Sequence, residues 1–228
     1  MPTEITIVFT TWPNHPKRWQ YFMTCIPRVL EMMTASQHEI RYVVVSESEK
    51  DPLNEWYGPQ LKAFCWNNHL PLSFRQGKPN LGAMMNDAMR ASHTKYTMIV
   101  QDDWFLEMPC DLSPGIALME EHPEIDIIRY SWPAHMISPP IGDFYGWRRI
   151  NPNGMWPYGD DPHIRRASFT ERFKPYIEYG HHGASEGDMV YEFGRKNAFV
   201  LLADKLYFGH CGEVSAVITD ERERAVKR

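Results

Sequence analysis

Short apolar runs alternate with longer amphipathic segments over the first hundred residues. Four runs have the length and residue types of buried strands, namely residues 5–12, 41–48, 70–77 and 96–100. The segments between them, 19–33, 55–69 and 82–92, carry apolar residues at helical spacing. Strands joined by helices of this length need crossover connections, which are right-handed and build a mainly parallel sheet. We therefore expect an α/β fold with helices on both faces of the sheet.

The second half of the chain is less regular. Residues 110–125 predict a helix and residues 126–132 a short strand. Residues 133–175 are rich in proline, glycine and aromatic residues, and predict an irregular excursion with one hairpin. A helix is expected around 183–197, and one or two strands between 199 and 213.

Composition limits the class of protein. The chain has 228 residues, 43% of them hydrophobic, which suits one globular domain with a real core. A net charge of −5 argues against a basic nucleic-acid binder. No apolar run reaches the roughly 20 residues that span a bilayer, and no signal peptide is evident, so the prediction is a cytoplasmic protein without a transmembrane segment. The four cysteines form no CxxC motif, as expected of reduced thiols.

Polar residues stand at the carboxyl ends of three predicted strands. These are Thr10 with Thr11, the serines of residues 46–48, and the adjacent Asp102 and Asp103. Ligands of open parallel sheets gather at this edge, so the three ends predict one site. Taken alone, two aspartates after a strand are equally well explained by a turn or a helix N-cap.

The order of these elements resembles a known enzyme family. The resemblance rests on six segments in order: a strand ending in TTW, a strand ending in SES, the stretch PNLGAMMNDA, a strand ending in QDDW, a later EGD and a final GH. In these segments the chain resembles the nucleotide-sugar glycosyltransferases of the GT-A fold, family 2-like group. The resemblance covers residues 5–213 apart from 133–175. It implies a single domain over residues 1–228, with a donor-binding half of about 1–110 and an acceptor-side half of about 111–228.

The resemblance implies a divalent metal, Mn²⁺ or Mg²⁺, that neutralises the leaving diphosphate. In this family the last aspartate of the motif binds the metal, which points to Asp103, and its neighbour Asp102 lies beside the donor. Gln101 stands where the family often has an acid, so the ribose contact departs from the pattern. His210 matches the position of a histidine ligand. The alternative for His210 is a histidine that is hydrogen-bonded at a strand end.

Transfer with inversion also needs a general base for the acceptor hydroxyl. Asp188 occupies the place of the family's acidic motif and is the predicted base, with Glu186 sharing the site or contacting the acceptor. The competing explanation is an acidic helix start, in which Ser185 is the N-cap and the acids favour the helix dipole. Both explanations can hold together.

The remaining donor contacts are also implied by resemblance. Thr10 and Thr11 lie where the family meets the base and ribose, and Glu47 where it has a base-reading aspartate. A UDP-sugar is the favoured donor, although Glu47 is one methylene longer than that aspartate. Three further residues belong to the loop and helix beside the donor, with a turn or tight bend as the structural alternative: Asn80, Gly82 and Asn86.

Three functions are consistent with these patterns. The first is a metal-dependent, inverting glycosyltransferase that acts on a hydroxyl of a glycan or small molecule. The second is a phage-type enzyme that glycosylates hydroxymethylated bases in DNA, suggested by the basic and aromatic residues of 147–149 and 163–166. The third is a non-catalytic binder of nucleotide sugars or glycans. A zinc site built from His181, His182 and nearby residues has no recognised spacing and is disfavoured.

Overall fold

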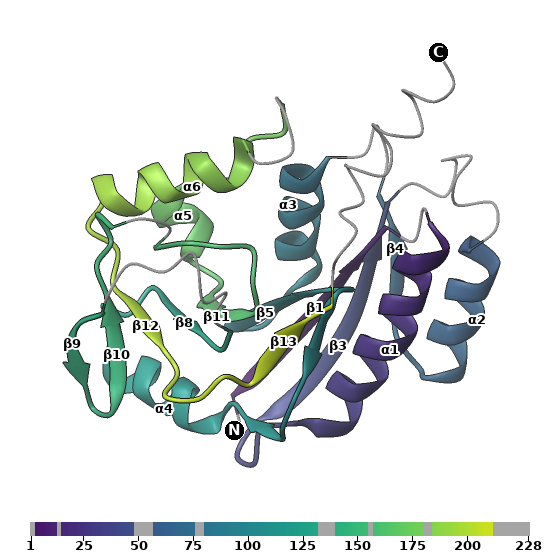
Figure 1. The fold of residues 1–228 in the computed structure, drawn as a ribbon, viewed down its shortest axis with the longest axis horizontal. Coiled ribbons are helices and arrows are strands. Elements are labelled where there is room, and N and C mark those ends of the chain that lie inside the picture. Colours follow the sequence, from purple (N-terminus) through teal and green to yellow (C-terminus); the bar gives the residue numbers. More distant parts are fainter. Residues whose placement is uncertain are drawn as a thin grey trace.

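The computed structural model describes residues 3–12, 15–47, 57–75, 80–131, 140–154, 157–179 and 184–211. A nine-stranded sheet forms the centre, with the order β4-β3-β1-β5-β11-β8-β12-β10-β9 (Figure 1). Its strands are β1 (Glu4–Thr11), β3 (Glu39–Ser46), β4 (Leu72–Phe74), β5 (Tyr96–Gln101), β8 (Ile127–Arg129), β9 (Pro140–Phe144), β10 (Trp147–Ile150), β11 (His163–Arg166) and β12 (Val200–Leu202).

Six helices and two small sheets complete the described fold. The helices are α1 (Pro16–Met32), α2 (Gly58–Asn67), α3 (Leu81–Ala91), α4 (Ser113–Glu121), α5 (Phe169–Phe173) and α6 (Ala184–Arg195). One small sheet pairs β13 (Phe208–His210) with β6 (Trp104–Leu106), and the other pairs β2 (Met33–Thr34) with β7 (Cys110–Asp111).

The two faces of the central sheet bury separate cores. In β1, Ile5, Ile7 and Phe9 face the core formed with α1, α2 and α4, whereas Val8 faces the core formed with α3, α5 and α6. This alternation follows from the two-residue period of a strand. Figure 1 shows α1 and α2 apart from α3, α5 and α6, as the two cores require. The predicted α/β sheet with helices on both faces is confirmed.

The predicted strands of the first half are confirmed as parallel neighbours. β1 pairs in parallel with β3 and β5, and β3 pairs in parallel with β4. The expected hairpin of the irregular excursion is β9 with β10. The sequence did not predict β11, which lies inside the sheet between β5 and β8 and runs antiparallel to both. The excursion therefore adds a central strand to the sheet.

The described helices include none that is long and apolar enough to cross a membrane.

Candidate functional site

Asp102 lies at the carboxyl end of β5 and is fully enclosed. Its Oδ2 accepts hydrogen bonds from the Thr11 hydroxyl (2.7 Å) and the Trp12 backbone N–H (3.3 Å), and its Oδ1 pairs with Arg18. The Asp102 N–H donates to the Thr10 carbonyl (3.1 Å). Burial raises the pKa of Asp102 to about 6 against the opposing effect of Arg18. With both oxygens engaged, Asp102 holds the ends of β1 and β5 together.

Arg18 binds both members of the aspartate pair. Its Nη2 contacts Asp102 Oδ1, and its Nη1 donates to Asp103 Oδ2 at 2.6 Å. The residue is only 6% exposed. Burial alone would lower the pKa of Arg18, but the two carboxylates outweigh burial and raise it. A guanidinium bound to two carboxylates offsets the repulsion between their adjacent charges.

Sequence reasoning missed Arg18. A signal was present, because Pro16 stands at the first position of α1 and places Arg18 in the first helical turn. Cations are unfavourable near a helix N-terminus, so a cation there suggests a compensating anion.

Asp103 and His210 are brought together as predicted. His210 belongs to β13, which pairs with β6 directly after the aspartates, and its ring lies 4.7 Å from the Trp104 ring. His210 Nε2 is 3.4 Å from Asp103 Oδ2. Burial favours a higher pKa for Asp103, but His210 and Arg18 together lower the pKa to about 2. Asp103 is therefore an anion at neutral pH.

The residues around Asp103 fit a divalent cation. Asp103 Oδ1 is buried and has no hydrogen-bond partner among the described residues, so one carboxylate oxygen is free to coordinate. Together with the His210 imidazole it offers two protein ligands, and the described chain contains no cluster of three or more His, Cys, Asp or Glu that could hold a metal. Mg²⁺-type sites commonly use one or two carboxylates and complete their shell with substrate phosphates and water.

Glu186 and Asp188 point to different partners. Glu186 Oε1 accepts a hydrogen bond from the Asp160 N–H at 3.3 Å. Asp188 pairs with Lys174 at 3.1 Å. Asp160 belongs to the segment before β11 and its carbonyl accepts a hydrogen bond from Gln101 Nε2 (3.3 Å), so Glu186 is connected to the end of β5. Within the described parts of the chain, Asp188 has no such connection. Asp160 is a candidate site residue that sequence reasoning missed.

Glu47 and Asn80 link the loops beside the aspartates. Glu47 is buried, its Oε2 pairs with Arg75 (2.7 Å), and its Oε1 accepts from the Asn80 N–H (3.2 Å). The Asn80 side chain caps α3 by accepting from the Ala83 N–H at 2.9 Å. These contacts give Glu47 and Asn80 structural roles at the predicted donor side. Their contacts with a nucleotide remain predictions.

Comparison with known proteins adds evidence on the fold. No family model and no curated protein sequence matches the chain. Among solved structures, S. aureus TarS residues 1–349 in complex with UDP-GlcNAc is similar over 93% of this chain and 62% of that chain, with 15% identity and a TM-score of 0.64. A mannosyltransferase, PcManGT from Pyrobaculum calidifontis in complex with GDP-Man and Mn²⁺, is similar over 99% of this chain and 61% of that chain, with 12% identity and a TM-score of 0.62.

The chain has the fold of these glycosyltransferases. This confirms the fold that the sequence predicts. The chain spans about two thirds or less of the length of these structures, and only 36% of a longer TarS structure.

Gly82 and Asn86 of this glycosyltransferase fold support the segment that precedes α6. A Cβ on Gly82 would clash with the Ile177 carbonyl oxygen, so the glycine allows α3 to approach the backbone at Ile177. The Asn86 side chain donates to the Tyr176 carbonyl and accepts from the Tyr176 N–H, both at 2.9 Å. Asn86 thus holds the chain at Tyr176. Contact of either residue with a donor stays a prediction.

Gly82→Ala is expected to destabilise the protein by about 1–3 kcal/mol, the usual range for overpacking a close contact. The measurement is the midpoint of urea-induced unfolding, compared at an unchanged dependence of the unfolding free energy on urea concentration. Gly58→Ala is the matched control, because a Cβ on Gly58 would meet no described atom within 4 Å. Equal midpoints for the two variants would contradict the assignment of Gly82 as a packing glycine.

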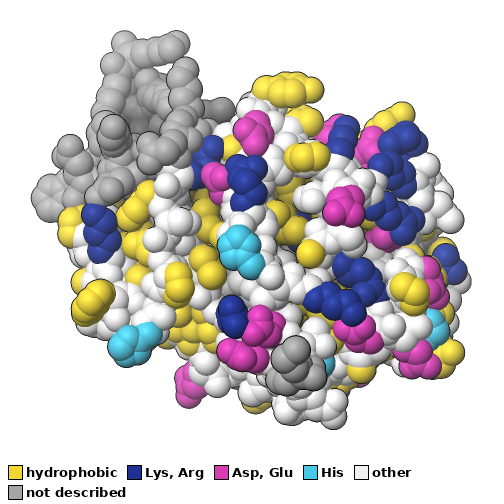
Figure 2. All heavy atoms as spheres, turned by 180° about the vertical axis from the view of Figure 1, so that it is seen from behind, with side chains coloured by type: hydrophobic (Ala, Val, Ile, Leu, Met, Phe, Trp, Pro, Cys, Tyr) yellow, Lys and Arg dark blue, Asp and Glu magenta, His cyan; other side chains and the backbone are white. Residues whose placement is uncertain are grey.

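The arginines that suggested nucleic-acid binding are largely used within the fold. Arg165 is fully buried and donates to the Tyr176 hydroxyl, and Arg166 donates to the Met119 carbonyl. Arg149 lies 4.3 Å from the Phe199 ring centre. On the face seen in Figure 2, basic side chains of the described residues are interspersed with acidic ones. These features do not favour a DNA acceptor. His181 and His182 lie outside the described residues.

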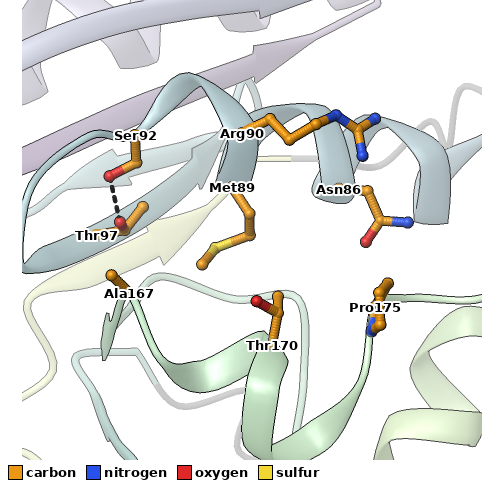
Figure 3. A pocket seen from close by; sticks show the side chains of 8 residues that line it. All are labelled: Asn86, Met89, Arg90, Ser92, Thr97, Ala167, Thr170 and Pro175. Carbon is orange, nitrogen blue, oxygen red and sulfur yellow. Dashed lines mark hydrogen bonds between the residues drawn. The ribbon is translucent and has the colours of Figure 1, made fainter.

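A cavity of about 230 Å³ lies between α3 and the chain around α5 (Figure 3). It is lined by Asn86, Met89, Arg90, Ser92, Thr97, Ala167, Thr170 and Pro175. The cavity is smaller than the usual 300–1,000 Å³ of a small-molecule site and includes neither aspartate of the pair. It is therefore not the donor site.

Proposed function

We propose that this protein is a metal-dependent, inverting glycosyltransferase that moves a sugar from a nucleotide-sugar donor to a hydroxyl acceptor. The observation that carries the proposal is the connection of two chemically different sites at the end of β5. Asp103 and His210 offer ligands for a cation, and Gln101, two residues before Asp103, binds the segment that positions Glu186. The fold shared with glycosyltransferases supports the same function.

Asp103 Oδ1 and His210 Nε2 would hold Mn²⁺ or Mg²⁺, with Arg18 keeping Asp103 in place. When bound, the cation supplies positive charge to the diphosphate leaving group. The solved complexes of the similar proteins contain UDP-GlcNAc in one case and GDP-Man with Mn²⁺ in the other. For this chain we propose a nucleoside diphosphate sugar, with a UDP-sugar favoured.

Glu186 is the proposed general base. It takes the proton of the acceptor hydroxyl while that oxygen forms a bond to C1 of the sugar and the bond from C1 to the diphosphate oxygen breaks. Burial raises the pKa of Glu186 above the ordinary value, which strengthens it as a base. Asp188 pairs with Lys174, and we therefore prefer Glu186 to the base that the sequence predicts. A binder without catalysis would have no need of a half-buried carboxylate here.

A nucleotide-sugar panel tests the donor site. We expect one UDP-, GDP-, CDP- or dTDP-sugar to stabilise the protein in the presence of Mn²⁺ and to do so much less with a chelator. At a ligand concentration of 100 Kd the stabilisation is about 2.7 kcal/mol, which raises Tm by roughly 5–10 °C for a chain of this size. The matched control is Asp103→Asn, which keeps the side-chain shape but should lose the metal-dependent part of the shift. No shift with any donor would contradict the proposal.

A further inference from the structure

Two thiols that are far apart in the sequence meet beside the aspartate pair. Cys25 Sγ lies 3.3 Å from Cys211 Sγ, although the two residues are 186 positions apart. All four cysteines of the chain lie in its described parts, and all are free thiols. Cys65 on α2 and Cys110 in β7 are packed in the apolar core instead. The fold therefore brings one particular pair of its four thiols into contact.

Both thiols are placed by residues of the candidate metal site. Cys25 comes two helical turns after Arg18 on the same buried face of α1, and Arg18 binds both aspartates. Cys211 directly follows His210, and its N–H donates to the Asp103 carbonyl at 3.0 Å. The Cys211 thiol lies 3.4 Å from the same carbonyl oxygen. A bond between the two sulfurs would therefore join α1 to the end of β13, next to His210.

We propose that Cys25 and Cys211 are a modification site at which a reversible disulfide fastens the end of β13 to α1. The bond requires the two sulfurs to approach from 3.3 Å to about 2.0 Å. Rotation of the two side chains supplies this approach, so the Cys211 N–H keeps its hydrogen bond to Asp103 and the strand stays in place. Only the consequence for metal binding, given below, rests on the proposed function.

The exposure of the two residues sets the order of the chemical steps. Cys211 is partly exposed whereas Cys25 is enclosed, so an oxidant meets Cys211 first. With glutathione disulfide as the oxidant, the Cys211 sulfur attacks one sulfur of the reagent, and one glutathione leaves as a thiol. The Cys25 sulfur then attacks the Cys211 sulfur and displaces the second glutathione as a thiol. The protein loses two protons and two electrons, the reagent gains them, and an excess of reduced thiol reverses the reaction.

The disulfide bears on His210, the proposed histidine ligand of the metal. His210 ends a three-residue strand, and its ring nitrogen lies 3.4 Å from Asp103 Oδ2. Fastening the next residue to α1 limits the motion of the imidazole relative to Asp103. Ligands that are held in place before binding lose less freedom on binding. We therefore expect the oxidised protein to bind Mn²⁺ about 2- to 10-fold more tightly than the reduced protein.

Peptide mapping of the wild type tests the disulfide directly. The protein is treated with glutathione disulfide, its remaining thiols are blocked, and it is digested without reductant. We expect the intact mass to fall by two hydrogens and the digest to contain one cross-linked pair of peptides, with Cys25 in one and Cys211 in the other. Dithiothreitol should separate the two peptides. A glutathione adduct of Cys211 as the final product, or a disulfide to Cys65 or Cys110, would overturn the proposal.

Thermal unfolding tests whether the disulfide fits the fold. The oxidised wild type should have a Tm roughly 4–16 °C above that of the reduced wild type, because the cross-link restricts the unfolded chain. Cys211→Ser should show no difference between the two treatments. Cys65→Ala is the matched control, which keeps the pair and should show the same difference as wild type. A Tm of the wild type that oxidation lowers or leaves unchanged would overturn the proposal.

Binding of Mn²⁺ alone, followed by the electron paramagnetic resonance of the free ion, tests the consequence for the metal site. Oxidised and reduced wild type are compared after the reagents are removed, and Cys211→Ser should bind Mn²⁺ equally after both treatments. Equal affinity of the two wild-type forms, including no binding by either, would overturn this consequence. Because the mapping and the Tm difference need neither metal nor donor, failure of the proposed function alone would leave both results intact. Sugar transfer by a protein that forms no such disulfide would overturn this inference alone.

Discussion

Asp103→Asn should reduce metal-dependent turnover by about 10³-fold or more, the size of effect seen when one preorganised electrostatic group is removed. The reason is that Asp103 Oδ1 is a buried carboxylate oxygen without a partner among the described residues, and the substitution removes the negative charge that would bind the cation. The measurement is the release of nucleoside diphosphate with and without Mn²⁺, together with Mn²⁺ binding in the presence of the donor nucleotide.

The matched control for Asp103→Asn is Asp204→Asn, an exposed aspartate on the chain between β12 and β13. It should retain full turnover and metal binding. If Asp103→Asn kept metal-dependent turnover, the assignment of Asp103 as metal ligand would be wrong.

Arg18→Met should give the largest loss of stability, about 3–5 kcal/mol, because it leaves the enclosed Asp102 carboxylate without its cation. For a chain of this size the loss lowers Tm by roughly 6–20 °C. Without Arg18 the pKa of Asp102 should rise further above its already raised value. A carboxyl group whose pKa is higher in the folded than in the unfolded state lowers the stability of the fold as pH increases. The destabilisation by Arg18→Met should therefore be larger at pH 7 than at pH 4. Thermal unfolding at the two pH values measures this.

Two companion variants test the cause of that loss. Arg18→Lys keeps the charge but cannot make two parallel contacts, and should lie between wild type and Arg18→Met. Adding Asp102→Asn to Arg18→Met removes the uncompensated charge and should recover part of the stability, as expected of directly coupled residues. Additive losses in the double variant would show that the ion pair does not stabilise the fold.

The first half of the fold could be predicted because its signals are local. The strands β1, β3, β4 and β5 are short apolar runs between helical segments, and their parallel pairing follows from the length of the connections. The proximity of Asp103 and His210 was predicted from the order of motifs in a known family. The order of motifs in the family indicates which residues far apart in the sequence lie close together in the fold. The spacing of residues along one chain does not indicate this.

β11 was missed because its sequence, HIRR, reads as a charged loop. Arg165 is nevertheless fully buried, with the Tyr176 hydroxyl as its hydrogen-bond partner and the Phe169 ring 5.1 Å away. A strand that buries an arginine breaks the hydrophobic pattern on which strand prediction depends. Missing β11 also hid Asp160, which reaches the site only because this strand is antiparallel to β5.

Arg18 was missed for a different reason. Its contact with Asp102 joins residues 84 positions apart, and a cation in the first turn of a helix indicates an anionic partner without indicating which one. Conversely, Gly82 and Asn86 were assigned to the donor loop, whereas the structure uses them to support the chain at Tyr176 and Ile177. In each case the partner lies in a distant segment of the chain, which only the folded structure reveals.

The central claim is that the end of β5 is the site of sugar transfer, and the most direct measurement is nucleoside diphosphate release from the donor identified by its thermal shift. We expect release that requires Mn²⁺ or Mg²⁺ in the wild type and is lost in Glu186→Gln, while that variant still shows the donor-dependent thermal shift. Release that is unchanged in Glu186→Gln, or no release from any nucleotide sugar with the acceptors supplied, would contradict it.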